Sequence, residues 1–425
     1  MGSDAVEGCA AKPEALAGLR ILWVKTELLH PVDKGGKIRT IEILKRLKLH
    51  HRVTYLTLDD GTAAADARER AEEYCHDLIC IPFRVARRSS ARFYAELVRN
   101  LLSRLPYAIG RYRSGAMRRT IDEQSRSGRY DLVISDFLVS AVNVPERLQL
   151  PKVLFQHNVE AVIWRRHADN ARHRAARVYF SLQWRRMLAF ERRACRTFDA
   201  VIGVSEDDCE VMRRDYGGRS IAPVPTGVDT DFFRPRGVAS LVPCSLVFTG
   251  SMDWMPNEDA IRFFFEDIMP AVLAQVPQAT LTVVGRNPGP ALLEIARTRP
   301  YVTVTGRVDD VRPYIEQATC FIVPIRIGGG TRLKIYEAMA MEKPVVSTTI
   351  GAEGLPLRDG VDILMADDPA DFAAAVVRLL RDEGLAREIG AQAAASVRSR
   401  FGWQPVTERF AELCESAVRS QARSR

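Results

Sequence analysis

Short runs of β-branched and aliphatic residues alternate with helical patterns along the whole chain. In the first half these runs predict strands at Arg20–Val24, Arg52–Leu58, Leu78–Ile81, Asp131–Ser135, Lys152–Phe155 and Ala200–Val204. In the second half they predict strands at Leu246–Thr249, Thr280–Val284, Val302–Thr305, Cys320–Val323, Pro344–Ser347 and Ile363–Met365. Continuous apolar strands separated by helices are typical of parallel sheets that helices cover on both faces. The pattern predicts an α/β protein with two such sheets.

A proline-rich break at Pro223–Pro235 separates the two sets of strands. We therefore expect two doubly wound, Rossmann-like domains that face each other across a cleft, since ligands in such folds lie beyond the carboxyl ends of the strands. The expected parts are a flexible tail at 1–18, a first domain at 19–225, a second domain at 226–400 and a C-terminal segment at 401–425. A last helix, from about Pro405 to Arg419, is expected to cross back to the first domain.

The composition excludes several classes of protein. The chain has 425 residues, too many for one ordinary core, and 47% of them are hydrophobic. No apolar stretch approaches the roughly 20 residues that cross a bilayer. The first 18 residues carry Asp4 and Glu7 before any basic residue, unlike a signal peptide. The eight cysteines form no CxxC pair. We expect a cytoplasmic protein without structural zinc.

Arginine is concentrated in one part of the first half. Between Glu160 and Arg196 there are ten arginines against three acidic residues. Together with nearby aromatic residues such as Trp164 and Phe180, the stretch Arg165–Arg196 predicts peripheral contact with an anionic membrane or a lipid-linked acceptor. Two alternatives remain, a solvated helix face and a nucleic-acid contact. The stretch resembles no nucleic-acid module, so nucleic acid is the less favoured partner.

Two glycine-containing loops could bind an anion. Gly35 and Gly36 stand between the first strand and a helix, where backbone N–H groups can approach a phosphate. A plain tight turn explains this pair of glycines as well. Neither a G-x-G-x-x-G fingerprint nor a Walker motif occurs.

The second loop follows the strand at Cys320–Val323. It reads Gly328, Gly329, Gly330, Thr331, Arg332, Leu333, Lys334 and leads into a helix that contains Glu337. N–H groups at the helix start and two cations suit a phosphate, whereas a carboxylate one turn later suits the hydroxyls of a ribose. The alternative is a capped helix with a Lys334–Glu337 surface pair.

His157 follows the strand at Lys152–Phe155, at an edge where ligands bind in such folds. A histidine there could hydrogen-bond a sugar hydroxyl or a developing charge. A structural role for the imidazole is the alternative.

Taken together, these residues resemble the retaining glycosyltransferases of the GT-B fold (family 4-like, group 1). The resemblance runs from Leu19 to about Ala417 and is most specific at Gly328–Ala340. Gly-Gly-Gly-Thr-Arg-Leu-Lys in the loop is similar to the subset that builds bacterial surface polysaccharides.

The resemblance implies transfer of a hexose from a nucleotide diphosphate sugar to a glycan or lipid-linked acceptor, with retention of the anomeric configuration. It implies no metal and no cofactor beyond the sugar nucleotide. The implied catalytic residues are His157, Lys334 and Arg332. The implied donor-binding residues are Gly35, Gly36, Gly250, Arg307, Val308, Gly328, Gly329, Gly330, Thr331 and Glu337. Among these, Glu337 would bind the ribose, the glycine loop and Lys334 the diphosphate, and Arg307 and Val308 the base.

Two positions depart from the family pattern. Gly329 stands where the family usually carries a glutamate, and the segment Gly250–Asn257 lacks the usual Arg and Lys. Arg332 and Lys334 could supply the missing charge. Two rival functions are a UDP-sugar epimerase on the same fold and a basic, non-catalytic scaffold that binds lipid or nucleic acid.

Overall fold

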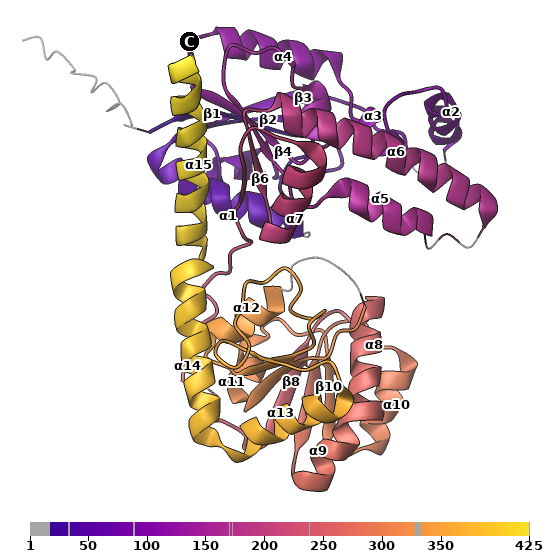
Figure 1. Cartoon of the computed structure of the whole chain (residues 1–425), viewed down its shortest axis with the longest axis vertical. Helices are drawn as coiled ribbons and strands as arrows, with labels where there is room; N and C mark the ends of the chain where they lie inside the picture. The colour runs from indigo at the N-terminus through magenta and orange to yellow at the C-terminus, as the bar shows by residue number, and fades with distance from the viewer. Residues whose placement is uncertain are drawn as a thin grey trace, which may run out of the picture. The chain divides into compact units, whose positions relative to one another are not determined.

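The computed structural model describes residues 18–32, 35–87, 90–169, 171, 173–237, 239–327 and 333–424. Within these residues the chain forms two compact units, each built on a parallel sheet with flanking helices (Figure 1). The first unit comprises residues up to Val201, the segment Asp215–Ser220 and the residues from Ala411 on. The second comprises Ile202–Arg214 and Ile221–Phe410.

The first sheet has seven strands in the order β3-β2-β1-β4-β5-β6-β7. Its strands are β1 (Arg20–Lys25), β2 (Arg52–Asp59), β3 (Asp77–Pro82), β4 (Leu132–Asp136), β5 (Lys152–Phe155), β6 (Ala200–Gly203) and β7 (Ile221–Pro223). The helices are α1 (Gly35–His50), α2 (Ala91–Asn100), α3 (Tyr107–Gly110), α4 (Gly115–Arg126), α5 (Glu160–Asp169), α6 (Arg174–Thr197) and α7 (Glu206–Val211). Short 3-10 helices are η1 (Glu69–Glu73) and η2 (Ser140–Asn143), and η3 (Met212–Tyr216) is a short π-helix.

The second sheet has six strands in the order β10-β9-β8-β11-β12-β13. Its strands are β8 (Ser245–Thr249), β9 (Thr280–Val284), β10 (Val302–Gly306), β11 (Cys320–Val323), β12 (Val345–Ser347) and β13 (Leu364–Met365). The helices are α8 (Met255–Phe263), η4 (Phe264–Ile268), α9 (Met269–Gln275), α10 (Pro290–Thr298), α11 (Arg312–Gln317), α12 (Leu333–Ala340), α13 (Pro369–Arg381), α14 (Glu383–Arg400) and α15 (Trp403–Ser424).

The predicted strands are confirmed to within one or two residues at each end, and so is the α/β fold class. β7 was not predicted, because its three residues lie beside the prolines that were interpreted as linker. The last helix is longer than expected at both ends. Its residues from Ala411 on group with the first unit.

The central strands of both sheets are buried on two faces, which explains their apolar runs. Residues Leu132–Asp136 of β4 are all buried, as are Cys320–Val323 of β11. The seven cysteines among the described residues are free thiols. In that part of the chain no helix is both long and apolar enough to span a bilayer.

Each sheet reverses its strand order beside its central strand. In the first sheet β1 lies between β2 and β4, and in the second β8 lies between β9 and β11. All of these pairings are parallel, so the carboxyl ends of the strands share one edge. A ligand crevice is expected at the carboxyl ends of β1 and β4, and a second at those of β8 and β11.

Candidate active site

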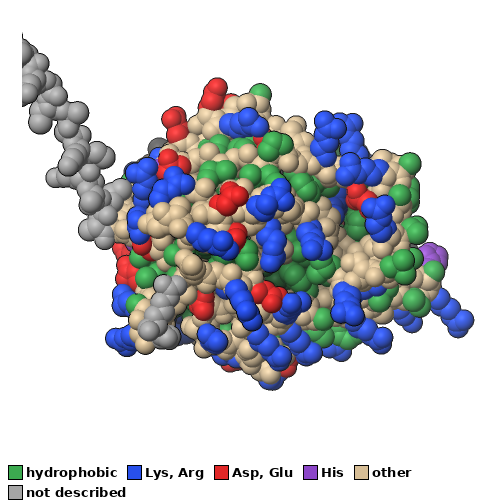
Figure 2. Space-filling view, turned by 90° about the horizontal axis from the view of Figure 1, so that it is seen from above, with side chains coloured by type: hydrophobic (Ala, Val, Ile, Leu, Met, Phe, Trp, Pro, Cys, Tyr) green, Lys and Arg blue, Asp and Glu red, His purple; other side chains and the backbone are tan. Residues whose placement is uncertain are grey.

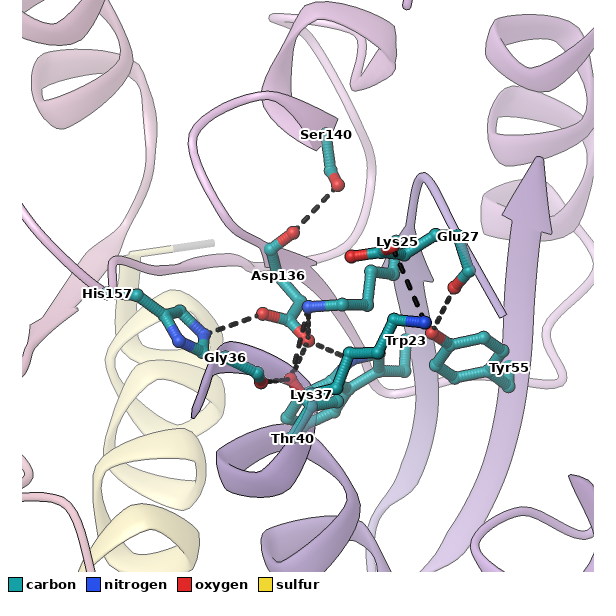
Figure 3. Close-up of polar contacts among 10 residues, drawn as sticks. All are labelled: Trp23, Lys25, Glu27, Gly36, Lys37, Thr40, Tyr55, Asp136, Ser140 and His157. Atoms are coloured by element: carbon teal, nitrogen blue, oxygen red, sulfur yellow. Dashed lines mark hydrogen bonds and ion pairs between the residues drawn. The ribbon is translucent and has the colours of Figure 1, made fainter. Parts of the chain in front are cut away.

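A buried carboxylate lies at the reversal point of the first sheet. Asp136, the last residue of β4, accepts hydrogen bonds from Lys25 Nζ at 2.9 Å and from Trp23 Nε1 at 3.1 Å (Figure 3). The Thr40 hydroxyl lies 2.7 Å from the same oxygen, Oδ2. Burial opposes ionisation, but Lys25 and a hydrogen bond from His157 hold the pKa of Asp136 well below its usual range. Asp136 is therefore a fixed negative charge paired with a buried ammonium.

His157 is oriented by the other oxygen of that carboxylate. Its Nε2 lies 2.8 Å from Asp136 Oδ1, and its ring stacks on Phe137 with centroids 3.8 Å apart. Burial lowers the pKa of His157 to about 3, although Asp136 acts in the opposite direction. The imidazole is neutral at pH 7, so Nε2 carries the proton donated to Asp136 and Nδ1 is the acceptor. A Cβ placed on Gly36 would lie 3.7 Å from that Nδ1.

Position 36 must be a glycine, because the ring of Phe137 lies too close to its backbone for a side chain. A Cβ at Gly36 would lie 2.7 Å from Phe137 Cζ, whereas one at Gly35 would meet nothing within 4 Å. Phe137 itself has φ of 70°, in the left-handed region that costs a non-glycine residue on the order of 1–3 kcal/mol. The structure therefore brings Gly35, Gly36 and His157 to one place and supports the ring of His157 with a strained aromatic residue.

A second carboxylate supports the segment that follows His157. Glu191 of α6 accepts hydrogen bonds from the backbone N–H groups of Glu160 at 3.0 Å and Ala161 at 2.9 Å, where α5 begins. Gln156 and Tyr216 also donate to it. Burial raises the pKa of Glu191 to about 7. Glu191 thus caps α5 and fixes the chain on both sides of His157.

A cavity of about 520 Å³ opens beside this cluster, within the first unit. Its polar lining includes Lys25, Glu27, Lys37, Asp59 and Glu160. A mixture of carboxylates and ammonium groups suits a polyhydroxylated ligand, because hydroxyls both donate and accept hydrogen bonds.

In the second unit, Lys334 lies over the end of β8. Its Nζ donates to Asn257 Oδ1 at 3.0 Å and lies 4.2 Å from the centroid of the Phe248 ring. A Cβ on Gly250 would come within 2.7 Å of Nζ and within 2.8 Å of Asn257 Nδ2. A side chain at Gly250 would therefore displace the ammonium. The structure brings Gly250 and Lys334 together.

The residue that follows β9, Gly285, lies directly against Gly250. A Cβ on Gly285 would lie 1.7 Å from the carbonyl oxygen of Gly250. Arg286, the next residue, donates from Nε to the Ser251 hydroxyl at 2.8 Å. Arg286 therefore places a mostly exposed guanidinium, 4.0 Å from the Asp253 carboxylate, against the loop after β8, where Gly250–Asn257 contains no Arg or Lys.

Glu337 lies one turn after Lys334 on α12 and is partly buried. Burial raises the pKa of its carboxyl to about 7, and the charge of Lys334 acts to lower it. Its carboxyl makes no hydrogen bond to another residue in the described part of the chain, so among those residues it is an acceptor without a donor. A carboxyl held in this state favours a ligand that donates hydrogen bonds to it.

For the remaining predicted site residues, the structure gives a position at most and no contact with the groups described above. Arg307 and Val308 follow β10, and β9 lies between β10 and β8. Gly328, Gly329, Gly330, Thr331 and Arg332 lie outside the described residues.

Sequence reasoning missed Asp136, Lys25, Glu191 and Arg286. The only signal for the first two was a charged residue at the end of an apolar strand. Among the described residues, no three His, Cys, Asp or Glu side chains gather as a metal site would require.

Two family models match the chain. Residues 34–232 match Glycosyltransferase Family 4, and residues 243–382 match Glycosyl transferases group 1. A similar curated protein, described as an uncharacterized 44.6 kDa protein in the cps region of Klebsiella pneumoniae, is 24% identical over 90% of this chain and 96% of its own length. D-inositol 3-phosphate glycosyltransferase of Streptomyces bingchenggensis is 25% identical over 71% of this chain and 70% of its own.

Two solved structures show the same fold. Sucrose-phosphate synthase from Thermosynechococcus elongatus superposes with a TM-score of 0.65 at 17% identity, over 95% of this chain and 100% of that one. HepE from Anabaena, in complex with UDP, superposes with a TM-score of 0.63 at 16% identity, over 94% of this chain and 100% of that one. The fold is the GT-B fold.

Proposed function

Because this chain belongs to the glycosyltransferases of the GT-B fold, with a family 4 domain followed by a group 1 domain, we propose that it transfers a hexose from a nucleotide diphosphate sugar. The observation that carries the donor assignment is Glu337, a carboxyl with a raised pKa beside Lys334 at the reversal point of the second sheet. HepE, which has the same fold, has been solved with UDP and with UDP-glucose.

The ribose is the part of the donor that Glu337 would bind. Two adjacent hydroxyls can each donate to one carboxylate, and these bonds stabilise the ionised form. Donor binding should then lower the pKa of Glu337 from about 7 and release a proton near neutral pH. This is a property of the ribose contact that a surface Lys–Glu pair would not have.

The diphosphate would lie between Lys334 and the loop after β8. Lys334 is oriented by Asn257, and Arg286 is held near the same loop by Ser251. Fixed cations of this kind stabilise the charge that grows on the departing diphosphate, which is where catalysis needs it. The loop Gly328–Arg332 is the further candidate from the sequence. With these groups present, transfer would proceed without a divalent metal.

The acceptor would occupy the cavity of the first unit. This cavity is lined by Lys25 and Phe137, which belong to the cluster that orients His157. The neutral imidazole would accept a hydrogen bond from a sugar hydroxyl through Nδ1. We propose a glycan or a lipid-linked sugar as acceptor and retention of the anomeric configuration as outcome.

The test begins with thermal-shift measurements against UDP, GDP and ADP, alone and as sugar nucleotides. The stabilising donor is then incubated with a lipid-linked monosaccharide, with EDTA present, and the product is examined by NMR. We expect full turnover and a retained anomer. Loss of turnover in EDTA or an inverted anomer would contradict the proposal. Incubation of the donor alone tests the rival reading, because an epimerase would convert it without an acceptor.

A further inference from the structure

The cavity of the first unit has a lining of two kinds. Charged side chains come from the ends of β1 and β2, the residues after them and α1: Lys25, Glu27, Lys37, Asp59 and Asp60. Apolar side chains come from α3, the residues after β4 and α6: Ala108, Ile109, Leu138, Val139 and Met187. The volume of about 520 Å³ is typical of small-ligand sites, which are mostly apolar with a few placed polar groups. A sugar ring, with hydroxyls at its edge and C–H groups on its faces, suits such a lining.

The two ammonium groups in this lining already have carboxylate partners. Lys25 Nζ lies 2.9 Å from Asp136 Oδ2 (Figure 3). Lys37 Nζ lies 3.7 Å from Glu27 Oε2 and donates to the carbonyl oxygen of Pro31 at 3.2 Å. A carboxylate or phosphate on a ligand would have to compete with these groups for the same positive charge.

The described lining carries more acidic than basic side chains, unlike the chain as a whole. Four acidic residues face the two lysines: Glu27, Asp59, Asp60 and Glu160. The whole chain instead has 61 Lys and Arg against 53 Asp and Glu. The face in Figure 2 likewise carries many more blue than red side chains. The excess of positive charge therefore belongs to the outer surface, and the described lining does not share it.

Glu160 is held in the lining by its backbone. It is the first residue of α5, and its N–H donates to the buried Glu191 at 3.0 Å. Burial raises the pKa of the Glu160 carboxyl, although a hydrogen bond from Asn158 acts in the opposite direction. A negative charge is thus already costly here, and a second one beside it would be more so.

We propose that the cavity accepts an uncharged sugar unit and excludes acidic sugars such as uronic acids, with Glu160 as the residue that sets this selection. The inference rests on the proposed function, because it takes the cavity as the acceptor site. A carboxylate on the incoming sugar would meet the negative charge of Glu160, and the lysines of the lining are already paired. A neutral sugar can instead donate a hydroxyl hydrogen bond to Glu160. A lipid-linked acceptor would then place its sugar in the cavity and its diphosphate outside.

Saturation-transfer NMR with matched methyl glycosides tests the selection on the full chain. The probes are methyl glucoside with methyl glucuronide, and methyl galactoside with methyl galacturonide, so that each pair differs in one carboxylate. Mildly alkaline pH keeps Glu160 ionised. We expect the Kd of each uronide to be about tenfold or more above that of its neutral partner. Glu160→Gln should reduce this ratio to about threefold or less, because it removes the repelling charge and keeps the size of the side chain.

Glu123→Gln is the matched control, since it makes the same change of charge at an exposed residue of α4. It should keep the wild-type ratio. Equal affinity of the wild type for both members of each pair, a ratio that Glu160→Gln leaves unchanged, or no binding by any probe would overturn the proposal. Calorimetric titration of the nucleoside diphosphate on the same three proteins should give one affinity. Absence of nucleotide binding would contradict the proposed function instead, so the two failures can be told apart.

Discussion

Replacing Asp136 by alanine would leave the ammonium of Lys25 buried without its counter-ion. The side chain of Lys25 is 2% exposed and that of Asp136 is 0% exposed. Removing one partner of such a pair costs about 3–5 kcal/mol. Each kcal/mol lowers the Tm of a unit of this size by about 2–4 °C, so the Tm of the first unit should decrease by about 6–20 °C.

The double variant Lys25→Met/Asp136→Leu separates stability from function. Replacing both charges by apolar side chains removes the unpaired buried charge, so part of the lost Tm should return. The recovery should be incomplete, because Trp23 Nε1 and His157 Nε2 still lose their acceptor. His157 would still lack the oxygen that orients its Nε2. Because a displacement of about 1 Å near the reacting atoms can slow turnover by about 10²-fold, turnover should stay low.

Calorimetry and steady-state kinetics on the wild type, Asp136→Ala and the double variant measure both effects. The reasoning would be refuted if Asp136→Ala melted at the temperature of the wild type. It would be refuted equally if the double variant regained both its Tm and its turnover, because Asp136 would then have no part in placing His157.

Three further predictions follow from the same contacts. Burial lowers the pKa of His157 to about 3, so between about pH 3 and 6.5 the unfolded chain binds one more proton than the folded chain. As the pH decreases through this window, the free energy of unfolding should decrease by up to about 1.4 kcal/mol per pH unit from this group. His157→Gln should therefore flatten a series of urea midpoints measured against pH. Gly36→Ala should destabilise the first unit by about 1–3 kcal/mol through its clash with Phe137, whereas Gly35→Ala, which has open space, should not, as differential calorimetry would show. Lys334→Ala should lower kcat more than it weakens binding of the nucleoside diphosphate, because its charge meets charge that grows during transfer; equal losses in kinetics and calorimetric titration would contradict this.

The sequence predicts the sheets well because their strands are buried on both faces. Runs such as Leu132–Ile134 and Cys320–Val323 are apolar without interruption and fully buried. β7 could not be predicted, since three residues beside prolines carry no periodicity. Its pairing depends on the edge that β6 offers.

Only part of the candidate site can be predicted from the sequence. Glycines and cations at the ends of strands mark the places where a ligand could bind, as at Gly36 and Lys334. The pairing of Lys25 with Asp136 spans 111 positions and exists only because β1 and β4 are neighbours.

The central claim is that Glu337 binds the ribose of a nucleotide donor, and calorimetric titration of the nucleoside diphosphate tests it most directly. Charged hydrogen bonds contribute about 1.5–3 kcal/mol each and are not additive, so Glu337→Ala should lose about 2–4 kcal/mol of binding, or about 30-fold to 900-fold in Kd. The loss should be smaller for a 2′-deoxy ligand. In the wild type, binding should strengthen as pH rises through 7, because ionised Glu337 is the better acceptor. A folded Glu337→Ala protein that binds the nucleotide with the affinity of the wild type, at every pH, would contradict the account.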